Sequence, residues 1–128
     1  AAAYDQRIAL DYIAAKIRHH DSAGVLLCAD FYHPALPAAE AGIPALYLMQ
    51  EYAGISYYTR IYFYDGYIRE LFAEAGLDFA PADGQALLPA EELRFAWRQG
   101  LIEIVCRAGG QEERLLISPR SETGWPHD

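Results

Sequence analysis

Positive charge is scarce in this chain. Lys16 is the only lysine, and 10 Lys and Arg residues stand against 18 Asp and Glu residues, which gives a formal net charge of −8 at pH 7. Residues 21–54 and 77–92 contain no Lys or Arg at all. Phosphate backbones and anionic membrane surfaces would repel such a chain. The composition therefore argues against a nucleic-acid or membrane partner, and it predicts that a basic protein partner would be attracted to the two base-free segments.

Cysteine and long apolar runs are scarce as well. Cys28 and Cys106 each lie in a short apolar run, so we expect buried free thiols, and a disulfide only if the chain is exported. No apolar run approaches the roughly 18 residues that a membrane-spanning helix needs. We expect a cytoplasmic protein, with the periplasm as the alternative because residues 1–3 could also be the small-residue side of a cleaved signal peptide.

The length of 128 residues predicts a single domain. We expect this domain to span residues 1–118 and to be followed by a polar, loosely ordered tail over residues 119–128. Apolar residues at helical spacing predict a helix over residues 4–20, and a short apolar run predicts a strand over residues 25–31.

Two segments that run from a proline to a glycine follow, over residues 37–42 and 44–54, and this punctuation favours short helices. The apolar residues within 45–53 also alternate as in a strand, so the sequence leaves helix and strand open there. The alternation over residues 55–64 is regular and predicts a strand.

The next segment predicts a tight turn and then a second helix. Asp65 is suited to cap the start of this helix and Gly76 to end it. The apolar residues have i, i+3, i+4, i+7 spacing, at Ile68, Leu71, Phe72 and Ala75. Residues 77–91 predict a long loop, and residues 93–118 predict three strands that alternate in polarity. The expected fold is α+β: an N-terminal helix and a mid-chain helix packed on a mostly antiparallel sheet of about five strands.

Residues 57–67, YYTRIYFYDGY, contain five of the ten tyrosines. Because alternate residues of a strand face opposite ways, the odd positions of this strand would face the core and the even positions would form a half-exposed second face. Tyr58, Arg60, Tyr62 and Tyr64 make up that even face. Tyr and Arg are enriched in binding hot spots, so this face is a candidate for partner binding, with cross-strand packing as the structural alternative.

Residue types that bind metals or act in catalysis are present, but their spacing forms no recognisable site. The potential metal ligands lie between positions 19 and 33: His19, His20, Asp21, Cys28, Asp30 and His33. Adjacent histidines on a helix diverge by about a hundred degrees, and no pair has a spacing typical of zinc ligands. Ser22 lacks a nucleophile elbow, the Glu91-Glu92 pair would face opposite ways in a strand, and no phosphate-binding glycine loop occurs. We therefore expect no cofactor, no metal and no enzymatic activity.

The sequence predicts a small acidic protein-binding module, such as an inhibitor or immunity protein that blocks a basic toxin or nuclease. The residues expected to bind the partner are those of the even face and four acidic residues of the second base-free segment: Tyr58, Arg60, Tyr62, Tyr64, Asp78, Asp83, Glu91 and Glu92.

Three alternatives stay open at this point. The expected order of helix, strands, helix and strands in a small acidic chain is similar to that of type III secretion chaperones, which implies a dimer that binds an effector, although a closing helix is missing. A small-ligand or enzymatic pocket would use the titratable and aromatic residues Tyr58, Tyr62, Trp97 and His33. A homodimer could form through an edge strand over residues 112–118.

Overall fold

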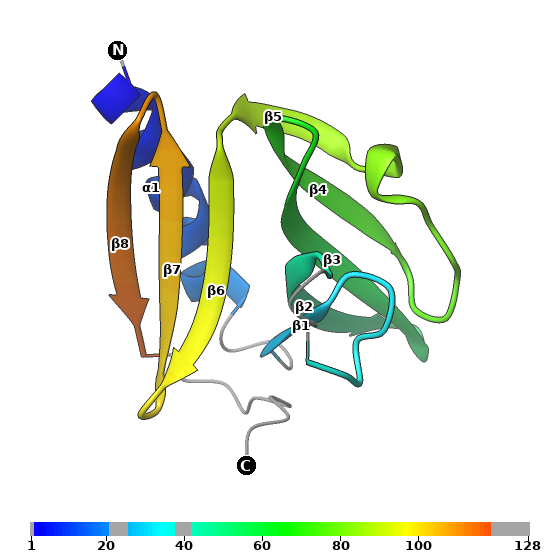
Figure 1. Ribbon diagram of the computed structural model, residues 1–128. Coiled ribbons are helices and arrows are strands. Elements are labelled where there is room, and N and C mark those ends of the chain that lie inside the picture. Colours follow the sequence, from blue (N-terminus) through cyan, green and yellow to red (C-terminus); the bar gives the residue numbers. More distant parts are fainter. Residues whose placement is uncertain (1, 21–25, 38–41, 119–128) are drawn as a thin grey trace.

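One helix and two antiparallel sheets make up the protein in the computed structural model, which describes residues 2–20, 26–37 and 42–118 (Figure 1). The five-stranded sheet has the order β1-β2-β3-β4-β5, and the three-stranded sheet has the order β6-β7-β8. The elements are α1 (Ala2–His20), β1 (Leu26–Asp30), β2 (Pro44–Tyr52), β3 (Ile55–Tyr64), β4 (Tyr67–Glu74), the 3-10 turn η1 (Pro81–Asp83), β5 (Gln85–Pro89), β6 (Glu92–Arg98), β7 (Leu101–Ala108) and β8 (Gln111–Ile117).

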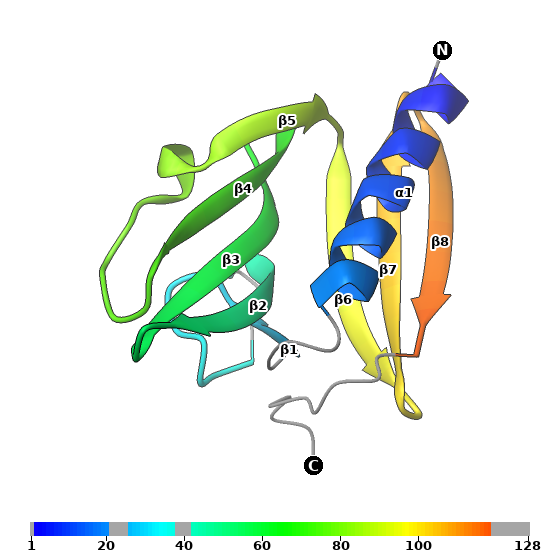
Figure 2. The ribbon, with the colours of Figure 1, turned by 180° about the vertical axis from the view of Figure 1, so that it is seen from behind.

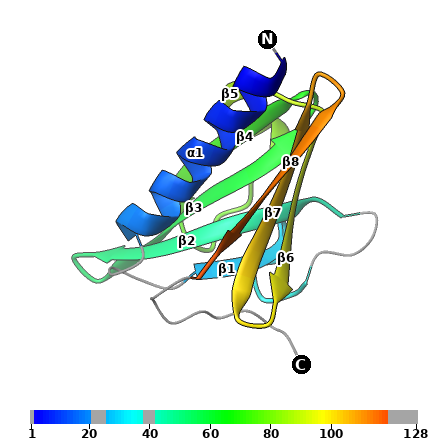
Figure 3. The same cartoon turned by 90° about the vertical axis from the view of Figure 1, so that its left-hand side faces the viewer.

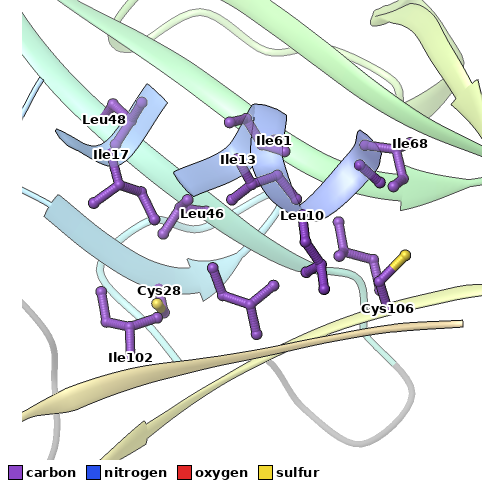
Figure 4. Packing of buried hydrophobic residues seen from close by; sticks show 13 residues of the cluster. Leu10, Ile13, Ile17, Cys28, Leu46, Leu48, Ile61, Ile68, Ile102 and Cys106 are labelled. Atoms are coloured by element: carbon purple, nitrogen blue, oxygen red, sulfur yellow. The ribbon is translucent and has the colours of Figure 1, made fainter. Parts of the chain in front are cut away.

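The helix packs along the three-stranded sheet and completes the core that this sheet shares with the five-stranded sheet. Leu10, Ile13 and Ile17 lie on one stripe of α1, and each is at most 1 % exposed. Figure 2 shows α1 running along the three-stranded sheet, and Figure 3 shows both of them packed against the five-stranded sheet. In the close-up, the helical side chains meet Leu46 and Ile61 from the five-stranded sheet, while the three-stranded sheet closes the core from below (Figure 4). A single apolar core therefore joins all three layers.

The predicted mid-chain helix is wrong, because residues 67–74 form strand β4. Asp65 and Gly66 have φ values of 53° and 85°, the left-handed pair that a tight β-hairpin turn requires and an α-helix start does not. The helix-like spacing arises because both faces of β4 are partly covered: Ile68 packs against the α1 side and Leu71 against the opposite side. Phe72, which the helical pattern would have buried, is 54 % exposed.

Other predicted elements are confirmed or made definite. The N-terminal helix, the strand over residues 55–64 and the three final strands are present. Residues 45–53, which the sequence left open between helix and strand, belong mainly to β2. The expected long loop contains η1 and β5, and the expected single sheet is two sheets. The segment 37–42 falls largely, and the tail over 119–128 wholly, outside the described residues.

Both cysteines are buried free thiols in the shared core. Burial disfavours the charged thiolate and raises the pKa of Cys28 to about 12 and that of Cys106 to about 11. Among the described residues, no helix combines the length and the apolar character that crossing a membrane would require.

Candidate functional site

Strand β3 separates two differently built regions of the five-stranded sheet. Its odd positions face α1, where Ile61 is fully buried and Thr59 is 7 % exposed. Its even positions face the other way, and there the expected half-exposed face is absent at two places: Arg60 is 4 % exposed and Tyr62 is fully buried. Tyr58 and Tyr64 are half-buried. Two connecting segments, residues 31–36 and 77–84, explain the difference because their side chains pack onto this face.

Tyr62 and Arg69 hold the second of these segments against the sheet. The Tyr62 hydroxyl donates to the Pro81 carbonyl at 2.6 Å and accepts from the Gly84 N–H at 3.1 Å. Burial raises the pKa of the Tyr62 hydroxyl. The Arg69 guanidinium adds bonds to the carbonyl oxygens of Ala82 and Gly84, at 3.4 and 3.2 Å. The segment between β4 and β5 is thus a fixed part of the structure.

Arg60 lies inside an aromatic cage that this packing creates. Its Nε donates to the Phe31 carbonyl and to the Tyr47 hydroxyl, each at 3.3 Å. Its guanidinium carbon lies 5.1 to 5.8 Å from the centroids of four rings, those of Phe31, Tyr47, Tyr58 and Phe79. Cation–π contacts of this kind contribute about 0.5–2 kcal/mol each. One guanidinium nitrogen, Nη1, is buried and has no hydrogen-bond partner among the residues that the structure describes.

A cavity of about 310 Å³ adjoins this cage. We call it the Arg60 cavity, and its lining residues are Phe31, Tyr32, His33, Arg60, Leu77, Asp78 and Phe79. His33 and Asp78 are exposed, so the cavity has one charged group at its base and titratable groups at its rim. Of the four residues named for a pocket in the sequence-based alternative, His33 is among the lining residues, whereas Trp97 packs against the shared core.

The other face of the five-stranded sheet, which faces α1, exposes an aromatic surface beyond the part that the helix covers. We call this surface the aromatic patch, and it consists of Tyr52, Ile55, Tyr57 and Phe72. Tyr52 and Phe72 are each 54 % exposed and Ile55 is 41 % exposed. The Tyr57 ring lies between its neighbours, 5.7 Å from the Tyr52 centroid and stacked at 5.4 Å on Phe72. The patch therefore spans three adjacent strands as one continuous row.

A polar cluster from the helix borders the aromatic patch. Lys16 pairs with Glu70 at 2.8 Å, and the Tyr12 hydroxyl donates to the other oxygen of the Glu70 carboxylate. Burial, together with this bond to Glu70, raises the Tyr12 pKa. A shallow hollow of about 260 Å³ lies between this cluster and the patch, and Tyr52 and Phe72 line it as well.

One exposed carboxylate, Glu74, borders the aromatic patch on the same sheet face, because it lies directly across from Tyr57 in the β3–β4 pairing. Glu51 lies across from Ser56 in the β2–β3 pairing and therefore belongs to the opposite face of the sheet. Within the described part of the chain, neither carboxylate has a Lys, Arg or His nitrogen within 4.0 Å. The single lysine of the chain, next to the patch, is occupied by Glu70. On the face of the patch, Glu74 is therefore a carboxylate whose charge no described cation matches.

The four acidic residues predicted to bind a partner do not form one surface. Asp78 lies at the Arg60 cavity, and Asp83 accepts from the Ala80 N–H at 2.8 Å, which closes the η1 turn. Glu91 accepts from the Gly110 N–H at 3.2 Å and lies near Arg107. Glu92 pairs with Arg94 at 2.6 Å and with Arg107 at 3.2 Å. Nearby arginine side chains therefore compensate the charges of Glu91 and Glu92.

Ion pairs cover the outer face of the three-stranded sheet. Glu103 is 5 % exposed and accepts from Arg98 at 2.6 Å and from Arg114 at 2.9 Å. The hydrogen bond from Arg98, supported by Arg114, holds the pKa of the Glu103 carboxyl below its usual range. Arg114 also contacts Glu112 at 3.3 Å. This face combines opposite charges in roughly equal number and resembles a stabilising network more than a surface awaiting a charged partner.

The residue types associated with metal binding do not come together. No group of three or more His, Cys, Asp or Glu side chains in the described ranges is placed to hold a metal ion. His19 and His33 are exposed and Cys28 is in the core, whereas the side chains of His20 and Asp21 lie outside the described set.

The family of the chain can be stated from its sequence. A family model described as a domain of unknown function, DUF4860, matches residues 4–108. The chain belongs to the DUF4860 family. The match runs from α1 to the end of β7, so both faces of β3 belong to the family domain. No curated protein and no solved structure matches the chain.

Proposed function

We propose that this DUF4860 domain is a non-catalytic binding module that engages a basic protein partner through the aromatic patch. The observation that carries the proposal is the exposure of a continuous row of aromatic rings across β2, β3 and β4. Contiguous exposed apolar surface of this kind marks interaction sites in proteins. Tyrosine is among the residues most enriched in binding hot spots.

The position of the patch also supports this function. The rings belong to paired strands, so their side chains are held in place before a partner arrives and lose little conformational entropy on binding. Glu74 lies beside the rings on the same face, without a cationic partner among the described residues. A partner that combines an apolar contact surface with Lys or Arg at its rim would match both features.

The acidic surroundings predict how association responds to salt. Residues 50–59 and 70–84 contain no Lys or Arg, and the chain carries a net charge of −8. Attraction between exposed charges is screened over about 8–10 Å at physiological ionic strength. Partner binding should therefore be faster and tighter at low salt, while the apolar contact keeps part of the affinity at high salt.

A comparative capture experiment tests the proposal. The bait is the domain itself, the variant carries Tyr52→Ser and Phe72→Ser, and the control carries Tyr67→Ser and Leu116→Ser, which remove two exposed apolar side chains elsewhere. We expect a basic protein from host lysate to bind the wild type and the control, with about 30-fold weaker binding to the patch variant. Equal capture by all three baits would refute a role for the patch.

Self-association is the second candidate, and strand β8 is the observation that favours it. Among the described residues β8 pairs with β7 alone, which leaves its other edge without a described partner strand, and Leu116 on β8 is 53 % exposed. Open edges can pair with a second chain. A mass that rises with concentration in light scattering, and that the Leu116→Ser change prevents, would support a homodimer.

We further propose a cytoplasmic location for the domain. Both cysteines are free thiols, and proteins of oxidising compartments more often pair their cysteines. Localisation of a tagged full-length chain by cell fractionation tests this, and recovery in the periplasmic fraction would refute it.

A further inference from the structure

We propose that the Arg60 cavity binds a carboxylate carried by an apolar group. The cavity lies on the face of β3 opposite to the aromatic patch, so this inference does not depend on the proposed protein partner. It assigns a ligand class to a buried cation that has no carboxylate within 4.0 Å among the described residues.

The first argument is the unbalanced charge of Arg60. The side chain is 4 % exposed, and no carboxylate among the described residues lies within 4.0 Å of its guanidinium. Buried charges are normally paired, because removing an ion from water is costly unless another charge compensates. The four surrounding rings compensate in part, but they supply no acceptor for the Nη1 hydrogens. An anion bound at this position would complete the environment of the guanidinium.

The second argument is the shape and the lining of the cavity. A guanidinium presents a planar donor edge that matches the two oxygens of a carboxylate. The walls are apolar and aromatic at Phe31, Tyr32 and Phe79, and the volume of about 310 Å³ corresponds to the lower end of small-ligand sites. A ligand with one carboxylate and one ring or branched aliphatic group would fill such a space.

The third argument concerns the number of charges on the ligand. Asp78 lies at the same cavity, and the chain as a whole is acidic. A dianion such as phosphate would be repelled by Asp78 more strongly than a monoanion, while Arg60 offers it only one positive charge. The cavity should therefore prefer a single carboxylate over inorganic phosphate.

A carboxylate of the chain itself is the competing explanation. The Asp30 carboxylate accepts from the Tyr32 N–H at 2.9 Å, and Asp30 directly precedes Phe31, whose carbonyl accepts from the Arg60 Nε. Glu40 lies outside the described residues. If either were the counterion of Arg60, then Asp30→Asn or Glu40→Gln would free the guanidinium and strengthen the binding of an added carboxylate by about tenfold or more.

Titration by nuclear magnetic resonance tests the proposal directly. The probes are 3-phenylpropionate, its neutral amide 3-phenylpropionamide, and inorganic phosphate, added to the full ¹⁵N-labelled chain. We expect 3-phenylpropionate to shift the Arg60 Nε–H resonance and the backbone amides of Phe31 and Phe79, and to bind about tenfold more tightly than the amide. Equal affinities of acid and amide, tighter binding of phosphate, or no shift with any probe would overturn the proposal.

Two variants and one control assign the response to the cavity. Arg60→Met should abolish the difference between acid and amide, provided that the spectrum shows a folded chain. If this variant unfolds, Phe79→Ala provides the same test from the half-buried wall, because removing the ring should weaken 3-phenylpropionate binding about tenfold or more. Leu116 is exposed on the three-stranded sheet, so the control Leu116→Ala should leave the affinity for 3-phenylpropionate unchanged. Unchanged binding in Phe79→Ala would overturn the assignment to this cavity.

Peptides then distinguish the source of the carboxylate. A short peptide that ends in phenylalanine is compared with the same peptide amidated at its C-terminus. Tighter binding of the free-acid peptide than of 3-phenylpropionate identifies the C-terminus of a protein as the ligand. Binding of 3-phenylpropionate without binding of either peptide identifies a small free acid, and both results support recognition of an apolar carboxylate.

Discussion

The contact between Gly84 and Tyr62 allows a quantitative test of how the segment between β4 and β5 is held. A Cβ atom at Gly84 would lie 2.2 Å from the Tyr62 hydroxyl oxygen and 3.0 Å from the ring carbon that carries it. The backbone of Gly84, with φ −71° and ψ 153°, is accessible to any residue. Glycine is therefore required here by space alone, and Gly84→Ala should displace the tyrosine hydroxyl from its two hydrogen bonds.

The expected free energies follow from this geometry. Gly84→Ala overpacks a buried contact and should lower the free energy of unfolding by about 1–3 kcal/mol. Tyr62→Phe leaves the Pro81 carbonyl and the Gly84 N–H without their partner and should cost about 1–3 kcal/mol. In the Tyr62→Phe background the closest atom is gone, so Gly84→Ala should cost under about 1 kcal/mol, which is a coupling of about 1–2 kcal/mol.

Urea unfolding of the four proteins, followed by circular dichroism, measures this cycle. The free energies are compared at equal m values, since a changed m value would signal a change in the unfolded state. Additive effects, within about 0.5 kcal/mol, would refute the close packing of Gly84 on Tyr62. Additive effects would also mean that Tyr62 does not hold the segment between β4 and β5, whose residues Leu77, Asp78 and Phe79 line the Arg60 cavity.

Three further predictions concern the turn, the thiols and the ion pairs. Gly66→Ala should destabilise the domain by about 1–2 kcal/mol in urea unfolding, because Gly66 has a φ of 85°; an unchanged or higher stability would instead fit the helix that the sequence predicted. Cys28 and Cys106 should react with a thiol reagent only as fast as the protein unfolds, because both are buried and have raised pKa values; rapid reaction in the absence of denaturant would contradict the shared core. The lowered pKa of Glu103 means that its ion pairs stabilise the fold above the pKa of the unfolded chain and are lost as the pH falls through the folded pKa. Glu103→Gln should accordingly be less stable at neutral pH and lose less stability than the wild type on acidification, and parallel pH profiles of the two urea midpoints would contradict this.

The sequence was sufficient to predict those elements whose hydrophobic pattern arises from the burial of a single face. The strand over residues 55–64 and the helix that ends at His20 were predicted because each shows a single, regular periodicity. Strand β4 was missed because covering on both faces gave Ile68 and Leu71 a helical spacing. The turn chemistry of Asp65-Gly66 was the better indicator of structure there, since both residues adopt positive φ.

The candidate site was harder to predict, because burial of β3 depends on segments distant in sequence. Arg60 and Tyr62 were placed on the correct face, but nothing in their neighbourhood indicates that residues 31–36 and 77–84 cover that face. The aromatic patch lies next to the last turns of α1, where Lys16 and His19 line the same hollow as Tyr52 and Phe72, and this tertiary arrangement cannot be read from local periodicity. The tyrosine content of residues 52–58 was a usable signal, although periodicity alone assigned Tyr57 to the core and not to a surface.

Site-specific photocrosslinking is the most direct test of the proposed protein-binding surface. p-Benzoylphenylalanine is introduced in place of Phe72 in the aromatic patch and, as a control, in place of Tyr67, which lies at the other end of the same strand and is 42 % exposed. We predict that illumination in host cells links one basic protein to position 72 and not to position 67. In a second experiment the lysate is illuminated instead, and we predict less crosslinked product at higher salt. A partner that crosslinks at position 67 but not at position 72 would contradict the assignment of binding to the aromatic patch.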